Sequence, residues 1–133
     1  MQFDVAIYTP RGLYRQTKAS IVNVIMPEGQ RGILPNHAAI VATLTASEMT
    51  MDEDGTHQTY AVGGGTIFFR NNQCTILTHS IENVNDIDID RALRAKERAE
   101  QRLESFDEAI DRDRARRALE RANNRIRMKR GTH

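Results

Sequence analysis

The sequence predicts a β plus α fold, in which an antiparallel β-sandwich over residues 1–86 is followed by an antiparallel two-helix hairpin over residues 87–133. Three observations predict this division. Alternating or β-branched runs separated by turn residues fill the first part, as in a sandwich or small barrel. All three prolines and seven of the eight glycines lie there too. From Asp88 onward, helix-forming residues with alanines three and four positions apart replace that pattern.

Each expected strand is a short apolar or alternating run that ends at a turn signal. The strands are expected at residues 3–8, 19–26, 40–44, 48–51, 59–62, 66–70 and 74–79. Residues 52–55 and 70–73 are expected to form hairpin turns, because Asn, Asp and Gly tolerate the positive φ of tight turns. About eight such strands can close over one core of Val, Ile, Leu and Phe.

Two helices are expected, of about 18 and 17 residues and each about 27 Å long. Asp86, Asp88 and Asp90 supply caps and negative charge for the first. The acidic residues 107–113 turn the chain and cap the second. The apolar face of the first helix is expected to hold Ala92, Ala95, Ala99, Leu103 and Phe106, and that of the second Ala115, Ala118, Ala122 and Ile126. A buried methyl contributes only about 0.8 kcal/mol, so this alanine seam suits a hairpin that can open.

Charge divides at the same boundary. Residues 1–86 carry five basic and eight acidic side chains, and residues 87–133 carry fourteen and ten, so a net −3 is joined to a net +4. Sixteen of the nineteen basic residues are arginines, and each helix carries an arginine row one position before its alanine row. The rows are Arg91, Arg94, Arg98 and Arg102, and Arg114, Arg117, Arg121 and Arg125.

Two interpretations of the arginine rows stay open at this point. A hairpin can bring both rows to one edge, where planar guanidinium groups match phosphate or carboxylate oxygens. Alternatively the rows form a solvated face, with ion pairs to glutamates three or four positions away. The glutamates available for such pairs are Glu97, Glu100, Glu104 and Glu120.

No catalytic constellation or metal site is expected. The four histidines lack a ligand spacing, and Gly63–Gly65 leads into a strand without a following Lys-Ser/Thr, so a bulge or a close strand crossing is expected there. Cys74, the single cysteine, is expected to be a small core or surface residue, and a disulfide framework is excluded. Without an apolar 18-residue window or a secretory signal pattern, a soluble protein of the cytoplasm is expected.

Three motifs in order, residues 31–37, 62–67 and 87–92, make the chain resemble the bacterial ATP synthase epsilon subunit family. The resemblance implies a sandwich of about ten strands that binds the γ subunit and the ring of c subunits in the central stalk. It implies a non-catalytic subunit that couples rotation, lies peripherally at the cytoplasmic face of the cell membrane without inserting into it, and binds no nucleic acid. Gln30 and Arg31 depart from the acidic residue that the family commonly has in this loop near the c-ring.

The resemblance also implies regulation. In the family the hairpin extends along γ into the α3β3 head and blocks ATP hydrolysis. In bacillus-like members the compact hairpin binds ATP as a regulatory ligand. No obligatory cofactor is implied. Arg98, Arg121 and Arg125 are the implied phosphate contacts, and Glu82, Asp88 and Arg91 the implied polar contacts near the adenosine and the junction. Ile87 and Ala92 would pack against the base and sugar. The list of implied ATP-binding residues is Glu82, Ile87, Asp88, Arg91, Ala92, Arg98, Arg121 and Arg125.

Two other functions remain. A purely structural stalk subunit whose hairpin never extends would keep every motif. An arginine-rich module for RNA or DNA is weakened by the nearly neutral total charge and by the scarcity of aromatic residues among the arginines.

Overall fold

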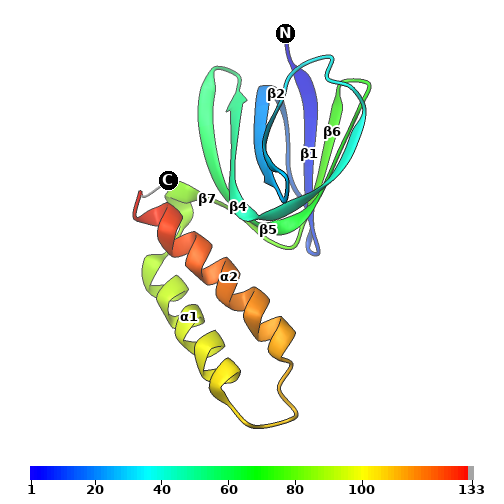
Figure 1. Ribbon diagram of the computed structural model, residues 1–133. Helices are drawn as coiled ribbons and strands as arrows, with labels where there is room; N and C mark the ends of the chain where they lie inside the picture. Colours follow the sequence, from blue (N-terminus) through cyan, green and yellow to red (C-terminus); the bar gives the residue numbers. More distant parts are fainter. Residues whose placement is uncertain (132–133) are drawn as a thin grey trace. The chain divides into compact units, whose positions relative to one another are not determined.

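The computed structural model describes residues 1–131, and it divides into two compact units, Met1–Asn83 and a second unit that begins at Val84 (Figure 1). The first unit is built of strands and the second of helices. The division falls three residues before the boundary expected from the sequence.

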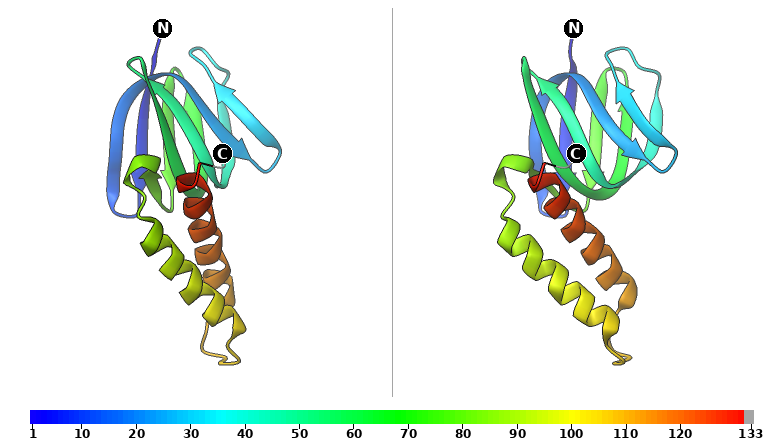
Figure 2. Two further views of the ribbon diagram at one scale, coloured as in Figure 1. Left: turned by 90° about the vertical axis from the view of Figure 1, so that its left-hand side faces the viewer. Right: turned by 60° about the vertical axis from the view of Figure 1, so that its left-hand side comes forward.

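The first unit is a seven-stranded sheet that closes on itself. Its strands are β1 (Phe3–Thr9), β2 (Gly12–Met26), β3 (Gly29–Ile33), β4 (Ile40–Glu53), β5 (Thr56–Arg70), β6 (Gln73–Thr78) and β7 (Ile81–Asn83). The order is β1-β6-β5-β4-β2-β3, and β1 also pairs with β2, so five strands surround one interior while β3 and β7 flank them (Figure 2). The pairing of β1 with β6 is parallel, and the others are antiparallel.

The strand count is seven rather than about ten, because the strands are longer than the sequence suggested. The expected strands 40–44 and 48–51 are both part of β4, and 59–62 and 66–70 are both part of β5. The β4–β5 ladder keeps one register across Gly63 and Gly65, so the glycines bend a strand without ending it. The first half of β2 was not predicted, because its side chains are mostly exposed and show no apolar alternation.

The predicted hairpin turns are confirmed. Asp54 has φ 48°, and Asn71 and Asn72 have φ 52° and 57°, the left-handed region that Asn and Asp tolerate. The close approach at the glycine run is confirmed as well: a Cβ on Gly65 would lie 2.8 Å from Thr78 Cα and closer still to the Leu77 carbonyl oxygen. Only glycine fits this crossing.

The core of the sheet unit holds the inward-facing residues of every long strand. Phe3 and Phe69 meet edge to face with ring centroids 5.2 Å apart, and Cys74 is buried beside them in the same cluster. The cluster also contains Met49 and Met51, which are fully buried and were not among the residue types expected in the core. Aromatic and aliphatic burial of this kind supplies the main stabilisation of the unit.

The second unit contains a short 3-10 turn, η1 (Val84–Asp86), and the helices α1 (Ile89–Glu104) and α2 (Arg112–Lys129). The helices pack against each other as a hairpin (Figure 1). Ala92, Ala99, Ala115 and Ala122 are buried, which confirms the alanine seam. Phe106 was wrongly placed on it: the helix ends at Glu104, Ser105 is extended, and Phe106 is 97% exposed.

Candidate functional site

The motif at residues 87–92 forms the first turn of α1. Asp88 is the N-cap, and its carboxylate accepts a hydrogen bond from the Arg91 backbone N–H at 3.1 Å. Ile87 and Ala92 are buried, whereas the Arg91 side chain is exposed. Asp88 therefore caps the helix, and the Arg91 guanidinium forms no ion pair within residues 1–131.

The two arginine rows share one face of the hairpin. In a right-handed helix, the residue before a seam position lies about 100° around the axis from it. Because the helices run antiparallel, this offset points to the same side of the seam in both. The N-terminal turn of α1 with Arg91 lies at the same end as the C-terminal part of α2 with Arg125, and Arg98 and Arg121 lie toward the middle of their helices.

Positive charge accumulates on this face. The pKa of Arg121 is lowered by burial and then by repulsion from Arg125, Arg117 and Arg114. Arg98, Arg114 and Arg117 form no ion pair within the described residues, and the helical ion pair of that region joins Arg116, off the row, to Asp113 at 2.8 Å. Arg98, Arg114 and Arg117 are thus not neutralised by ion pairs with the neighbouring glutamates, while Glu120 offsets part of the repulsion at Arg121. At these three positions the anion-binding interpretation is favoured over the ion-paired one.

Seven of the eight residues implied for ATP lie in the helical unit. Glu82 lies in the sheet unit, on β7, where it is half-buried and faces Ala61 of β5 in the ladder. Of the seven, Asp88, Arg91 and Arg98 are exposed, Arg121 and Arg125 are half-buried, and Ile87 and Ala92 are buried. The hairpin therefore gathers the four implied arginines but uses Ile87 and Ala92 for packing.

A second feature, on the sheet unit, was missed by the sequence reasoning. The outward face of β1, β6, β5 and β4 carries large apolar side chains in adjoining positions: Leu77 is the ladder neighbour of Tyr8, and Val41 that of Phe68. All four are exposed, by 69% in the case of Val41. We call Tyr8, Val41, Phe68 and Leu77 the outer patch. The sequence does contain a sign of the patch. These residues stand at positions that alternate with the core residues of the same strands, so their side chains point to the outer face.

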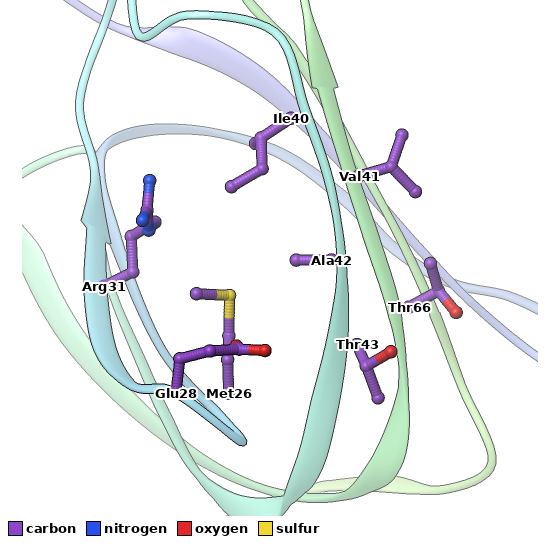
Figure 3. A pocket seen from close by; sticks show the side chains of 8 residues that line it. All are labelled: Met26, Glu28, Arg31, Ile40, Val41, Ala42, Thr43 and Thr66. Atoms are coloured by element: carbon purple, nitrogen blue, oxygen red, sulfur yellow. The ribbon is translucent and has the colours of Figure 1, made fainter.

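A cavity of about 410 Å³ adjoins the outer patch at the edge of the sheet unit (Figure 3). Met26, Ile40 and Ala42 point into it, while Glu28 and Arg31 stand on the β2–β3 side (Figure 3). Val41 lines it as well and turns away from its interior (Figure 3). The cavity therefore combines an apolar interior with one charge of each sign.

No group of three His, Cys, Asp or Glu side chains within residues 1–131 is placed to hold a metal ion. Neither helix there combines the length and the apolar character needed to cross a bilayer.

Comparison with known families gives two adjoining matches. Residues 2–84 match the ATP synthase delta/epsilon chain β-sandwich domain, and residues 85–130 match the long α-helix domain of the same chain. The epsilon chains of ATP synthase from Bacillus thuringiensis (strain Al Hakam) and Bacillus cereus (strain B4264) are 42% identical over 102 residues, which are 77% of this chain and of each relative.

Solved structures share the fold. A chain of the Euglena gracilis mitochondrial ATP synthase, solved as OSCP/F1/c-ring, superposes with a TM-score of 0.76 at 21% identity, covering 99% of this chain and 82% of the other. A chain of the Tetrahymena thermophila mitochondrial ATP synthase central stalk and c-ring has a TM-score of 0.58 at 14% identity, covering 97% and 94%.

Proposed function

Because the chain belongs to the ATP synthase delta/epsilon family and is related to bacterial epsilon chains, we propose that it is the non-catalytic epsilon subunit of an ATP synthase. In this role it sits in the central stalk and couples rotation between the c-ring and the catalytic head. It is peripheral, at the cytoplasmic face of the membrane. The observation that carries the proposal is that both domains of the family follow each other over residues 2–130.

The sheet unit is the docking part in this proposal, and the outer patch is its contact with the γ subunit. Tyr8, Val41, Phe68 and Leu77 expose apolar surface across four neighbouring strands. Contiguous apolar surface on a folded domain is typical of an interface, and aromatic residues are enriched in such contacts. The related folds were solved within stalk and c-ring assemblies, which supports the same setting here.

Charge substitution tests the docking surface. Val41→Asp and Phe68→Asp should weaken co-purification with γ and the c-ring about tenfold or more, because each leaves a carboxylate in a desolvated contact. Thr56→Asp is the control: it introduces the same carboxylate at an exposed residue of β5, at the opposite end of that strand from Phe68. Equal retention of γ by all three variants would place the contact elsewhere.

The helical unit is the regulatory part. ATP would hold the hairpin closed, with Arg98, Arg121 and Arg125 toward the phosphates and Glu82, Asp88 and Arg91 toward the adenosine and the junction. The concentration of positive charge around Arg121 supports a polyanionic ligand. A ligand at 100 times its Kd adds about 2.7 kcal/mol, about as much as the four buried alanine methyls of the seam at about 0.8 kcal/mol each, although the helical unit also buries Ile126 and Met128. The α and β subunits become partners when the hairpin opens.

Calorimetry with ATP on the full chain tests the ligand. Arg91→Ala combined with Arg125→Ala should abolish binding measurable at millimolar ATP. Arg116→Ala removes an arginine of the same helix that is paired with Asp113 off the row, and it should leave the affinity unchanged. If the unmodified chain binds no ATP at millimolar concentration, the proposal reduces to a purely structural stalk subunit.

A further inference from the structure

The sheet unit contains a buried carboxylate that belongs to neither candidate site. Within residues 1–131, Glu53 at the end of β4 is the only charged residue that is buried, at 4% exposure. Its Oε1 accepts a hydrogen bond from Nε of Arg15 at 2.7 Å and lies 2.5 Å from Nη2 of the same guanidinium. Its Oε2 accepts a hydrogen bond from the hydroxyl of Tyr60 at 2.7 Å. We call Arg15, Glu53 and Tyr60 the carboxylate network.

The carboxylate network joins three neighbouring strands. Arg15 lies in the exposed first half of β2, Glu53 ends β4, and Tyr60 lies on β5. These strands are consecutive in the sheet, in the order β5, β4, β2. Burial and the hydrogen bond to Glu53 raise the pKa of Tyr60, so its hydroxyl keeps the proton that it donates. Both oxygens of the carboxylate therefore have a donor, and each donor comes from a different strand.

Stability alone does not account for this network. Burying a carboxylate costs free energy that an ion pair returns only in part, and apolar residues of similar volume often stabilise such a position equally well. A fully satisfied polar network adds direction, because each hydrogen bond restricts an angle as well as a distance. The ring of Tyr60 is 2% exposed and meets that of Tyr14 edge to face at 6.4 Å, while its hydroxyl is bonded to Glu53. The network therefore orients β5 at Tyr60.

The position of Tyr60 matters because β7 is paired there. The short strand β7 pairs with β5, and the three residue pairs are Val62 with Ile81, Ala61 with Glu82, and Tyr60 with Asn83. Asn83 is the last residue of the sheet unit, and its side-chain amide donates to Gln58 of β5 at 2.9 Å. Short segments with few contacts open at a low free energy. The orientation of Tyr60 therefore decides whether the last pair of β7 stays closed.

We propose that Arg15, Glu53 and Tyr60 are positioning residues that keep the last pair of β7 closed and thereby fix Glu82 for a bound nucleoside triphosphate. This inference rests on the proposed response of the hairpin to ATP and extends it to residues that do not touch the ligand. Glu82 is the one implied ATP-binding residue in the sheet unit, and the β5–β7 ladder determines its place. The carboxylate network acts on the nucleotide through that ladder.

The test is made on the full chain, with hydrogen exchange at residues 81–83 and calorimetry of ATP binding. Tyr60→Phe keeps the buried ring and removes the hydroxyl that donates to Glu53. Exchange of the β7 amides should become about tenfold faster, and the Kd for ATP should rise about threefold to tenfold, because a hydrogen bond to a charged group is lost. Glu53→Gln is the conservative variant. Its amide can accept from Arg15 and donate to the Tyr60 oxygen, so it should retain most of the protection and the affinity.

Two controls separate positioning from a general loss of stability. Asp52→Asn changes the carboxylate next to Glu53, whose partner is His57 at the surface at 2.6 Å, and it should change neither the exchange of β7 nor the Kd. Val5→Ala removes fully buried apolar atoms from β1, a strand that pairs with β2 and β6. It should lower the free energy of unfolding and leave the ATP affinity of the folded chain unchanged.

Three results would overturn the inference. Unchanged exchange of the β7 amides in Tyr60→Phe would show that the network does not hold this strand. Faster exchange with an unchanged Kd would show that the place of β7 has no bearing on the nucleotide. An equal rise of the Kd in Val5→Ala would assign the effect to stability. The proposed ATP response fails separately, if the unmodified chain binds no ATP while Tyr60→Phe still speeds exchange; the network then anchors β7 and positions no ligand residue.

Discussion

Gly65 is a position at which the sheet unit accepts no side chain. Its φ is +149°, and an added Cβ would collide with the Leu77 carbonyl and Thr78 Cα of β6. Gly65→Ala is therefore expected to lower the free energy of unfolding by about 3 kcal/mol or more, from strain and overpacking together. Urea denaturation measures this loss.

Gly55→Ala separates the two causes. Gly55 has φ +83° in an open turn with no atom within 4 Å of the added Cβ, so only backbone strain applies. A loss of about 1 to 2 kcal/mol is expected there. Equal losses at both positions would contradict the close crossing at Gly65.

Cys74 makes stability depend on alkaline pH. Burial raises the pKa of its thiol from 9.0 to about 12. Above pH 9 the unfolded chain loses this proton and the folded chain keeps it, so the stabilisation is complete below pH 9 and is lost as the pH rises toward 12. The free energy of unfolding should fall by about 1 kcal/mol between pH 9 and 10.

The control for this dependence is Cys74→Ala, measured over the same interval. The pKa of Tyr60 is also raised, by burial and by its hydrogen bond to Glu53, but from an ordinary value of 10.0, so its effect begins at higher pH. The slope between pH 9 and 10 should largely disappear in Cys74→Ala. An unchanged slope would assign it to another group.

At the scale of elements, the two helix caps allow folding to be separated from ATP binding. Asp88 and Asp111 each accept a hydrogen bond from the third residue after them, at 3.1 and 3.0 Å. Replacing either residue by alanine should destabilise the hairpin by about 1 kcal/mol. Hydrogen exchange measures this loss as faster exchange of the amides in both helices.

Only Asp88→Ala should in addition lower the ATP affinity, because Asp88 belongs to the predicted ligand residues. Asp111→Asn keeps an acceptor and is the control, and equal loss of ATP affinity in both alanine variants would limit Asp88 to its capping role.

The features that could be predicted from the sequence are visible in short runs of residues. Asp88 could be identified as a cap because residue type and immediate neighbours determine it. The run Gly63–Gly65 could be identified as a bulge or a close crossing because residues without side chains let another strand approach. The length of β4 and β5 could not, since a continuous ladder depends on pairing between distant strands. The exposure of Phe106 also escaped prediction, because the apolar spacing continues past the residue at which the helix ends.

The candidate sites also differ in whether their residues are close together in the sequence. The arginine rows are local periodicities, and the hairpin placed them on helices that pack along the predicted alanine seam. The outer patch depends on which face of β4, β5 and β6 is left outside when the sheet closes through the β1–β6 pairing. The hydrogen bonds between Asn36 and Asn72 join residues 36 positions apart, and no periodic pattern in the sequence predicts them.

For the whole molecule, the two units should be separable in function. The extended hairpin would be about 60 Å long over some 40 helical residues, compared with about 27 Å for each packed helix. A synthase assembled with a chain that ends at Asp86 keeps the outer patch, so it should retain the subunit. This truncated synthase should hydrolyse ATP several-fold faster than the complete enzyme when ATP is scarce, and at the same rate when ATP saturates the hairpin.

Initial rates over a range of ATP concentrations measure this difference, with retention of the subunit checked in each preparation. Equal rates at every concentration would remove the inhibitory role and leave a stalk subunit whose hairpin stays closed.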